Sequence, residues 1–211
     1  MKLLFWMLMV LSVSIAWANE ASDMSEKKLF GLLNPINSFT ANFNQQQLDP
    51  QGNPLQTLTG VLHGQKPNKV YWTVFEPAAQ TIVSNGSHLW LYDPDLEQVI
   101  IEPYSDNPEA NPISLLLGNP QQLSENFEIL GHNLEAQSKL QFFLKPTKIN
   151  TLYTDLMIEF EGKNLSAISF KDSLGQTTHL AFKQFDLNPI FKDEFFTFQV
   201  PKGVDIVSHV R

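Results

Sequence analysis

The fold is decided by residues 58–101, which read LTGVLHGQKPNKVYWTVFEPAAQTIVSNGSHLWLYDPDLEQVII. Short runs rich in β-branched and aromatic residues alternate here with turn residues such as Asn85–Gly86 and Asp93–Pro94–Asp95. This spacing predicts a meander of antiparallel strands. The predicted strands are Leu58–His63, Lys69–Phe75, Gln80–Ser84, His88–Tyr92 and Gln98–Ile101.

Side chains alternate along these strands, because successive residues of a strand point to opposite faces of the sheet. Val70, Trp72 and Val74 share one face, whereas Tyr71 and Phe75 share the other. Both faces therefore carry large apolar groups, which a sheet with one solvated face does not need. Two architectures fit this pattern. One is a twisted sheet with a helix layer on one side and scattered exposed aromatics on the other; the second is a curved sheet whose concave face forms an apolar cavity.

Residues 1–18 are typical of a cleaved export signal. Lys2 supplies a short positive region, residues 3–15 are apolar, and Ala16–Trp17–Ala18 fits a cleavage site. The apolar run is shorter than the roughly 20 residues that span a bilayer. We therefore expect a signal peptide over residues 1–18 and a single domain over residues 19–211.

The composition of the chain limits its partners. The formal net charge is −8, and removal of Lys2 with the signal would make it more negative by one unit. Arg211 is the only arginine, so the sequence holds no basic track for nucleic acid or anionic lipid headgroups. The chain has no cysteine, which excludes disulfides and a lipid-bearing cysteine at the cleavage site. We expect a soluble exported protein that does not bind nucleic acid.

Helices are expected over two segments outside the meander. Residues 22–36 form the first, which ends at Asn34–Pro35. Residues 112–127 hold a short helix that is apolar nearly all round, followed by a second one. A helix of about six residues is not stable alone in water, so it must lie on an apolar surface. It is either a crossover helix that plugs the sheet or a lid that opens when a ligand competes for its place.

The rest of the chain is predicted to extend the meander into one antiparallel sheet of about ten or eleven strands, with helices 22–33 and 112–127 on one side. A sheet of this length is expected to curl, since curling protects its apolar face and its edges. The further predicted strands are Ser38–Gln47, Phe127–His132, Leu140–Lys145, Leu156–Phe160, Leu165–Lys171, Thr177–Phe185, Phe195–Gln199 and Val204–Val210.

The sequence carries no recognisable motif for catalysis or metal binding. Its five histidines are isolated, without HxH or HExxH spacing, so no metal site is predicted. It has no G-x-S-x-G elbow, no phosphate-binding loop and no cysteine nucleophile. Asp93 and Asp95 flank Pro94 and are turn residues rather than a catalytic carboxylate pair. We therefore expect no cofactor and no enzymatic activity.

Several motifs along the chain resemble those of a known family. They are GxLxxxKPNxxxW over residues 60–72, IVSNGxxLWxYDPxxEQ over residues 82–98 and FxFxxPxGV over residues 196–204. The N-terminal helix with Phe39 and Phe43, and the apolar helix after Asn111–Pro112, extend the likeness. In this order and spacing they resemble the periplasmic outer-membrane lipoprotein carrier proteins, the LolA family.

The resemblance implies a mainly β (α+β) fold, an incomplete antiparallel β-barrel whose helices cover an apolar cavity. The cavity would take the acyl chains of acylated lipoproteins that an inner-membrane ABC-type lipoprotein-releasing complex extracts. The carrier would cross the periplasm as a monomer and pass the lipoprotein to an outer-membrane lipoprotein receptor of the same fold. That receptor needs a lipid-bearing cysteine, so a chain without cysteine fits the carrier.

The resemblance also suggests a latch. Family members typically have an arginine at the position of Lys66, which in the closed form bonds to the backbone of the lid helices. Lysine keeps the charge but lacks the planar fork that holds two carbonyls at once, so we expect Lys66 to latch the lid less firmly. The alternative is a solvated turn lysine.

Face parity and position in the lid predict the residues that line the acyl-chain cavity, although any of them could instead be core packing. They are Phe43, Leu58, Leu62, Trp72, Ile113, Leu116 and Leu117. Two other functions fit a lipid-binding fold. A signalling regulator of similar fold would bind the periplasmic part of a membrane protein. A lipid hydrolase would release fatty acid, whereas a carrier returns its ligand unaltered.

Overall fold

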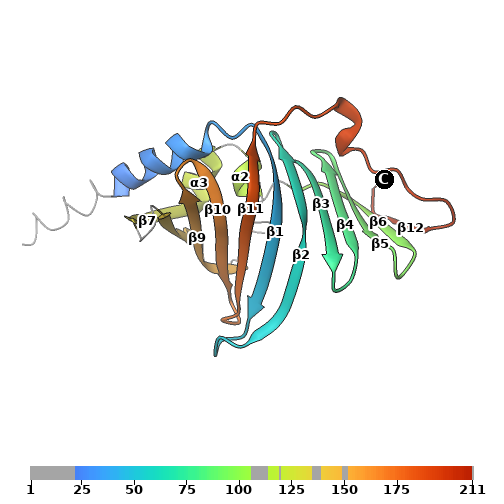
Figure 1. Ribbon diagram of the computed structural model, residues 1–211, viewed down its shortest axis with the longest axis horizontal. Coiled ribbons are helices and arrows are strands. Elements are labelled where there is room, and N and C mark those ends of the chain that lie inside the picture. The colour runs from blue at the N-terminus through green and yellow to red at the C-terminus, as the bar shows by residue number, and fades with distance from the viewer. Residues whose placement is uncertain (1–21, 106–113, 119, 135–138, 149–151, 211) are drawn as a thin grey trace, which may run out of the picture.

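The computed structural model describes residues 22–105, 114–118, 120–134, 139–148 and 152–210. Its main feature is one 12-stranded sheet, which twists and curves into an open half-barrel (Figure 1). The predicted signal peptide lies outside the described residues, as does Ile113. None of the helices in the described ranges is long and apolar enough to cross a membrane.

The sheet keeps nearly the order of the chain. Its spatial order is β12-β6-β5-β4-β3-β2-β1-β11-β10-β9-β8-β7, and every described pair is antiparallel except β12 with β6. The predicted meander is confirmed, and the sheet has 12 strands where about ten or eleven were predicted. The strands are β1 Ser38–Leu48, β2 Pro54–Gln65, β3 Lys69–Glu76, β4 Gln80–Asn85, β5 His88–Asp93, β6 Gln98–Pro103, β7 Phe127–Leu134, β8 Lys139–Pro146, β9 Tyr153–Glu161, β10 Asn164–Asp172, β11 Thr177–Leu187 and β12 Asp205–Ser208.

One predicted strand is wrong. Residues 195–199 do not form a strand, because Asp193–Phe196 form a short 3₁₀ helix, η2, and Thr197 continues as coil. The rings of Phe191, Phe195 and Phe196 pack against one another, with centroids 4.7–5.1 Å apart. This segment is therefore ordered by an aromatic cluster rather than by pairing with a neighbouring strand.

The C-terminal segment, residues 188–204, returns from β11 past the meander to β12 (Figure 1). Its Phe195 ring lies 5.6 Å from the ring of Tyr71, and its Phe198 ring lies 5.4 Å from that of Tyr92. Val83, which shares this face of the sheet, is fully buried. The segment thus covers the outer face of the meander and explains why both faces carry large apolar groups.

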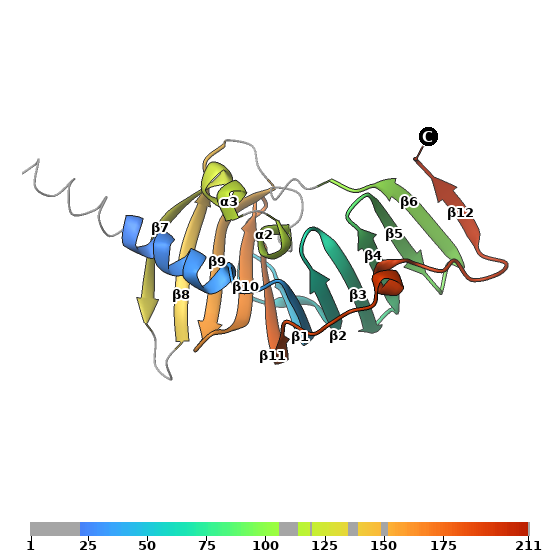
Figure 2. The same ribbon diagram turned by 90° about the horizontal axis from the view of Figure 1, so that it is seen from above.

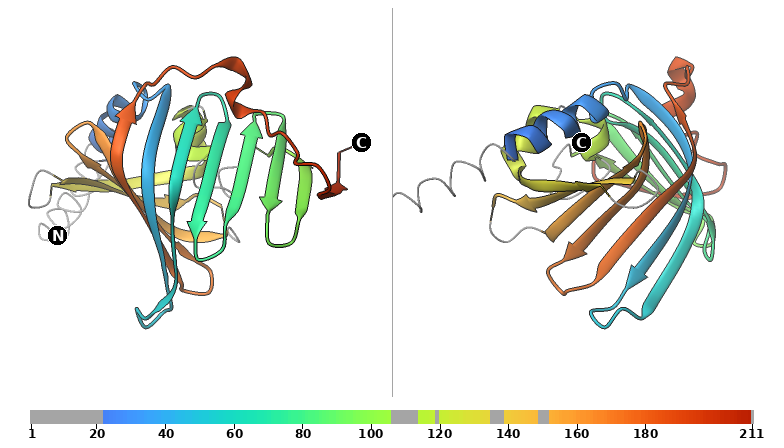
Figure 3. Two further views of the ribbon diagram at one scale, coloured as in Figure 1. Left: turned by 45° about the vertical axis from the view of Figure 1, so that its right-hand side comes forward. Right: turned by 60° about the vertical axis from the view of Figure 1, so that its left-hand side comes forward.

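The helices lie on the concave side of the curved sheet (Figure 3). The first covers residues 22–33 and ends at Asn34–Pro35, as predicted, so residues 34–36 of the predicted span are not helical. The lid helices are α2, Ser114–Leu117, and α3, Pro120–Asn126. In Figure 2 these helices lie over the half of the sheet around β7 to β11, and β3 to β6 extend beyond them.

The core fills the space between the helices and the concave, inner face. Leu29 and Leu33, one turn apart on the first helix, are buried against it. From the sheet, Phe142 and Phe160 meet edge to face with centroids 6.1 Å apart and are both fully buried. Of the two architectures that the sequence allows, the structure is the curved sheet, and the helices fill one half of its concavity.

Candidate functional site

Strand pairing aligns two rows of side chains on the inner face of the meander, beyond the helices. The first row runs through Trp72, Ile82, Leu91 and Ile100, and the second through Val70, Ser84, Leu89 and Glu102. Most of these side chains are half-buried rather than buried, although they lie on the same face as the core. The inner face of the sheet is therefore apolar well past the region that the helices cover.

These rows border a cavity of about 390 Å³, which we call the inner cavity. Its volume is within the roughly 300–1,000 Å³ typical of small-molecule sites. Apolar side chains supply most of its lining, and the polar groups gather toward β6 and the residues that follow it. The lining residues are Val70, Trp72, Ile82, Ser84, Leu89, Leu91, Glu102, Pro103, Tyr104 and Ser105.

Trp72 lies where the core meets the inner cavity. The ring of Phe43 packs edge-on against Trp72, with centroids 5.1 Å apart and an interplanar angle of 68°. Phe43 can take this place because Gly60 has no side chain. A Cβ on Gly60 would stand 2.7 Å from Phe43 Cε1 and would collide with the Thr73 carbonyl oxygen. Glycine is therefore required at this crossing of β1, β2 and β3.

The structure divides the predicted cavity residues between the core and the inner cavity. Only Trp72 lines the inner cavity, and Leu58 is half-buried beside the core. Four others are buried core residues: Phe43, Leu62, Leu116 and Leu117. Ile113 lies outside the described residues. Contact between these residues and an acyl chain stays a prediction.

Nine of the ten lining residues were not among those predicted, and they include the apolar side chains of Ile82, Leu89 and Leu91. Their strands were correctly predicted, and a signal that identifies them exists in the sequence. Ile82 pairs with Trp72 across β3 and β4, and Leu91 pairs with Ile82 across β4 and β5. Since cross-strand partners share a face, extending the parity of Trp72 over two hairpins selects this row.

Lys66, the predicted latch, lies in the turn between β2 and β3. Its Nζ donates a hydrogen bond of 3.0 Å to the carbonyl oxygen of Leu33, in the last turn of the first helix. Carbonyls at a helix C-terminus lack intrahelical partners and carry partial negative charge, so a cation is stabilising there. Burial lowers the pKa of the Lys66 ammonium below its ordinary value of 10.5. Lys66 is thus a half-buried residue that caps the first helix.

The same turn also touches the lid through its backbone. The Asn68 N–H donates a bond of 3.3 Å to the carbonyl oxygen of Leu117, at the end of α2. The side chain of Lys66 therefore reaches the first helix, while a main-chain group two residues later holds α2. A latch between Lys66 and the lid helices stays a prediction, and any such coupling would pass through this turn.

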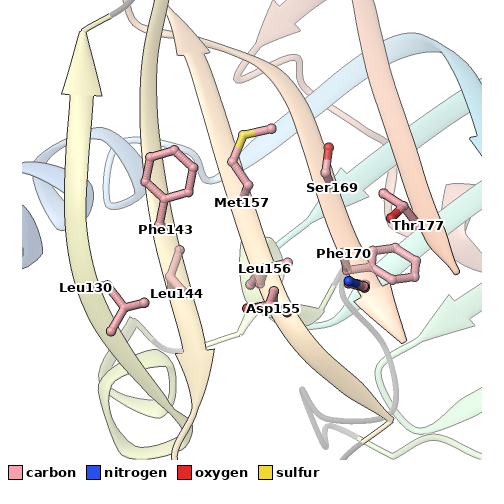
Figure 4. A pocket seen from close by; sticks show the side chains of 10 residues that line it. Leu130, Phe143, Leu144, Asp155, Leu156, Met157, Ser169, Phe170 and Thr177 are labelled. Carbon is pink, nitrogen blue, oxygen red and sulfur yellow. The ribbon is translucent and has the colours of Figure 1, made fainter. Parts of the chain in front are cut away.

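A second apolar groove, the outer groove, lies on the opposite face of the sheet (Figure 4). It measures about 370 Å³, and Phe143, Met157 and Ser169 lie side by side in it on β8, β9 and β10. Phe143 and Met157 alternate with Leu144 and Leu156, which are buried in the core. The sheet therefore separates this groove from the core and the inner cavity.

Polar contacts elsewhere give little indication of catalysis. Ser25 Oγ lies 2.7 Å from His132 Nδ1, but Ser25 is only 2% exposed and this pair joins the first helix to β7. Ser169 Oγ lies 2.6 Å from His179 Nδ1 and links β10 to β11. Within the described ranges, no three His, Asp or Glu side chains come together as a metal site.

Comparison with known proteins places the chain in a family. The family profile described as "Outer membrane lipoprotein carrier protein LolA" matches residues 34–199. An outer-membrane lipoprotein carrier protein from Hahella chejuensis is 34% identical over 199 residues, which cover 92% of this chain and 95% of that protein. One from Pseudomonas aeruginosa is 34% identical over 207 residues, 98% of each chain. A solved structure, an uncharacterized conserved protein from Thermus thermophilus, shares the fold at 13% identity, with a TM-score of 0.54 over 90% of this chain and 98% of that one. The chain belongs to the outer-membrane lipoprotein carrier family, LolA.

Proposed function

We propose that this chain carries lipoproteins by holding their acyl chains on the inner face of its half-barrel. Family membership supports this function, and one structural observation carries it. The apolar face that forms the core under the helices continues, half-buried and without a described helix above it, into the inner cavity. An acyl chain entering there meets a mostly apolar surface that is continuous with the core.

The energetics of the cargo require such a surface. Each buried methylene is worth about 0.8 kcal/mol, so exposing one long acyl chain to water costs on the order of 10 kcal/mol. Free diffusion of a lipoprotein through an aqueous compartment is therefore excluded. A carrier has to replace the bilayer over the whole length of the chain, yet release it again.

Displacement of the lid helix α2 would enlarge the inner cavity. α2 is only four residues long, and it is held by burial of Leu116 and Leu117 and by the Asn68–Leu117 backbone bond. A helix this short is unstable without those contacts. We infer that an acyl chain entering beside Trp72 displaces α2 and so extends the cavity toward Phe43 and Leu62.

The carrier would work in the periplasm. The predicted signal over residues 1–18 would export it, and residues 19–211 would act as a single monomeric domain. It would receive lipoproteins from an inner-membrane ABC-type complex and deliver them to an outer-membrane receptor. Its role is transfer without chemistry, so the lipid should leave unaltered.

Mass spectrometry of the protein purified from periplasm, together with its bound lipids, tests this proposal. Intact acylated lipoprotein in about equimolar amount is the expected result. Free phospholipid alone would contradict a lipoprotein carrier, and accumulation of fatty acid from an added lipid would favour the hydrolase.

A matched pair of variants locates the site. Leu91→Gln places an amide in the inner cavity, whereas Phe143→Gln places one in the outer groove. We expect the first to reduce bound lipoprotein at least about tenfold, since a desolvated amide without a partner is costly. The second should leave the amount unchanged.

A further inference from the structure

The indole of Trp72 holds an unused hydrogen-bond donor. Its Nε1 is buried and has no hydrogen-bond partner within the part of the chain that the structure describes. Nearly all buried polar groups in native proteins are paired, so an unpaired donor calls for an explanation. An indole nitrogen only donates, so the missing partner must be an acceptor.

The neighbours of Trp72 on the sheet offer no side-chain acceptor. Its cross-strand partners are Leu62 on β2 and Ile82 on β4, and its ring packs against Phe43. All three side chains are hydrocarbon, and the same tryptophan lines the inner cavity. A phenylalanine could also supply an apolar ring to the lining of the cavity. The indole N–H is therefore the feature of Trp72 that its apolar contacts do not explain.

An acyl chain is a hydrocarbon that ends in a carbonyl group. The hydrocarbon can slide along an apolar surface, because methylene groups are all alike. A single donor placed among apolar groups fixes where such a ligand stops, as few polar groups do in most small-molecule sites. The polar lining of the inner cavity, toward Glu102 and Tyr104, would then lie near the more polar end of the ligand.

We propose that Trp72 Nε1 donates a hydrogen bond to the carbonyl oxygen of a bound acyl group and so sets the depth of the chain in the inner cavity. Trp72 is then the residue that distinguishes acyl from alkyl chains. This inference depends on the proposed function, because it assumes that the inner cavity takes acyl chains.

A matched pair of ligands tests it. 1-Palmitoylglycerol is an ester, and 1-O-hexadecylglycerol is the ether that lacks only its carbonyl oxygen. We expect the wild-type protein to bind the ester about five- to tenfold more tightly, the typical effect of one net hydrogen bond. In Trp72→Phe this preference should fall to about one, since both ligands lose the same ring contact and only the ester loses a hydrogen bond.

Trp90 provides the control, since it lies on β5, two strands away from β3, and on the opposite face of the sheet. Trp90→Phe should keep the full ester preference. A preference that survives in Trp72→Phe would overturn the inference, as would equal binding of both ligands by the wild-type protein. Failure of the wild-type protein to bind either ligand would instead contradict the proposed function.

A further measurement makes the test independent of the variants. In the wild-type protein, the indole proton resonance of Trp72, assigned through its contacts with Phe43, should move downfield with the ester and not with the ether.

Discussion

The two halves of the sheet differ in what covers their inner face. Around β7 to β11 the helices close it, and side chains such as Phe142 and Phe160 are fully buried. Over β3 to β6 no described helix lies above it, and Trp72, Ile82 and Leu91 remain half-buried around a cavity. In that second half the cover lies instead on the outer face, in the C-terminal segment.

The difference shows how one sheet can serve both stability and binding. Apolar burial on the covered half stabilises the fold, since each large core side chain contributes about 1.5–3 kcal/mol. In the other half Val83 and Phe196 are buried on the outer face, while Trp72, Ile82 and Leu91 on the inner face stay half-buried and available to a ligand. Substitutions in the covered half should therefore lower mainly the free energy of unfolding, and substitutions in the uncovered half should lower mainly the affinity for acyl chains.

The largest effect is expected in the covered half. Phe160→Ala should lower the free energy of unfolding by about 3–5 kcal/mol, because the ring is fully buried against Phe142 and its removal leaves a cavity. Urea denaturation measures this loss. Phe143→Ala, on the outer face of the same half, is the control and should cost far less; similar losses for both would contradict the assigned core.

A smaller effect is expected at Glu159, which joins three strands of the covered half. Its carboxylate accepts hydrogen bonds from Lys139, Gln141 and Ser166. Burial alone would raise its pKa, but these bonds and the Lys139 charge outweigh burial and hold the pKa below the ordinary 4.5. Glu159→Gln should cost about 1–3 kcal/mol at pH 7.

The pH dependence of that loss follows from the lowered pKa. A carboxylate with a depressed pKa stabilises the fold fully above its unfolded value, and the contribution is lost as pH falls through the folded value. The gap between wild type and Glu159→Gln in urea denaturation should therefore narrow below about pH 4.5. A gap of equal size at pH 7 and pH 3 would show that the charge contributes nothing.

A still smaller effect is expected at the junction between the halves. Lys66→Met removes the bond to Leu33 and should cost about 1 kcal/mol, because Lys66 is partly exposed. If Lys66 latches the lid, hydrogen exchange should speed up in α2 and α3 as well as in the first helix. Exchange that rises only in residues 22–33 would reject the latch. Lys69→Met, at the start of β3, serves as the control.

The smallest effect on stability is expected in the uncovered half. Leu91→Ala should change the free energy of unfolding by less than about 1 kcal/mol, because its side chain is only half-buried. Its effect on acyl-chain binding should be larger than its effect on folding, in contrast to Phe160→Ala. A loss of stability comparable to that of Phe160→Ala would mean that Leu91 is an ordinary core residue.

Most of the fold could be predicted from the sequence, since alternation and turn residues are local signals. They indicated the meander of β2 to β6 and the short lid helices, α2 and α3. The strand predicted at Phe195–Gln199 is wrong because Phe195 and Phe196 pack in an aromatic cluster with Phe191. This is a tertiary contact, which local signals do not show.

The site was harder to predict than the fold. Face parity correctly placed Trp72 on the inner face, but it could not distinguish the closed half from the open half, which depends on where the helices lie. Phe43 and Leu62, which were predicted as lining, are buried in the core, and their contact with an acyl chain stays a prediction. The partner of Lys66, the carbonyl of Leu33, likewise depends on how the first helix packs.

The proposed function requires the acyl chain to lie in the inner cavity and not elsewhere on the protein. Photo-crosslinking with a diazirine-bearing acyl lipid, followed by mapping of the labelled residues, tests it most directly. Labels are expected on Trp72, Ile82 and Leu91. Labels concentrated on Phe143 and Met157, in the outer groove of similar volume, would contradict it.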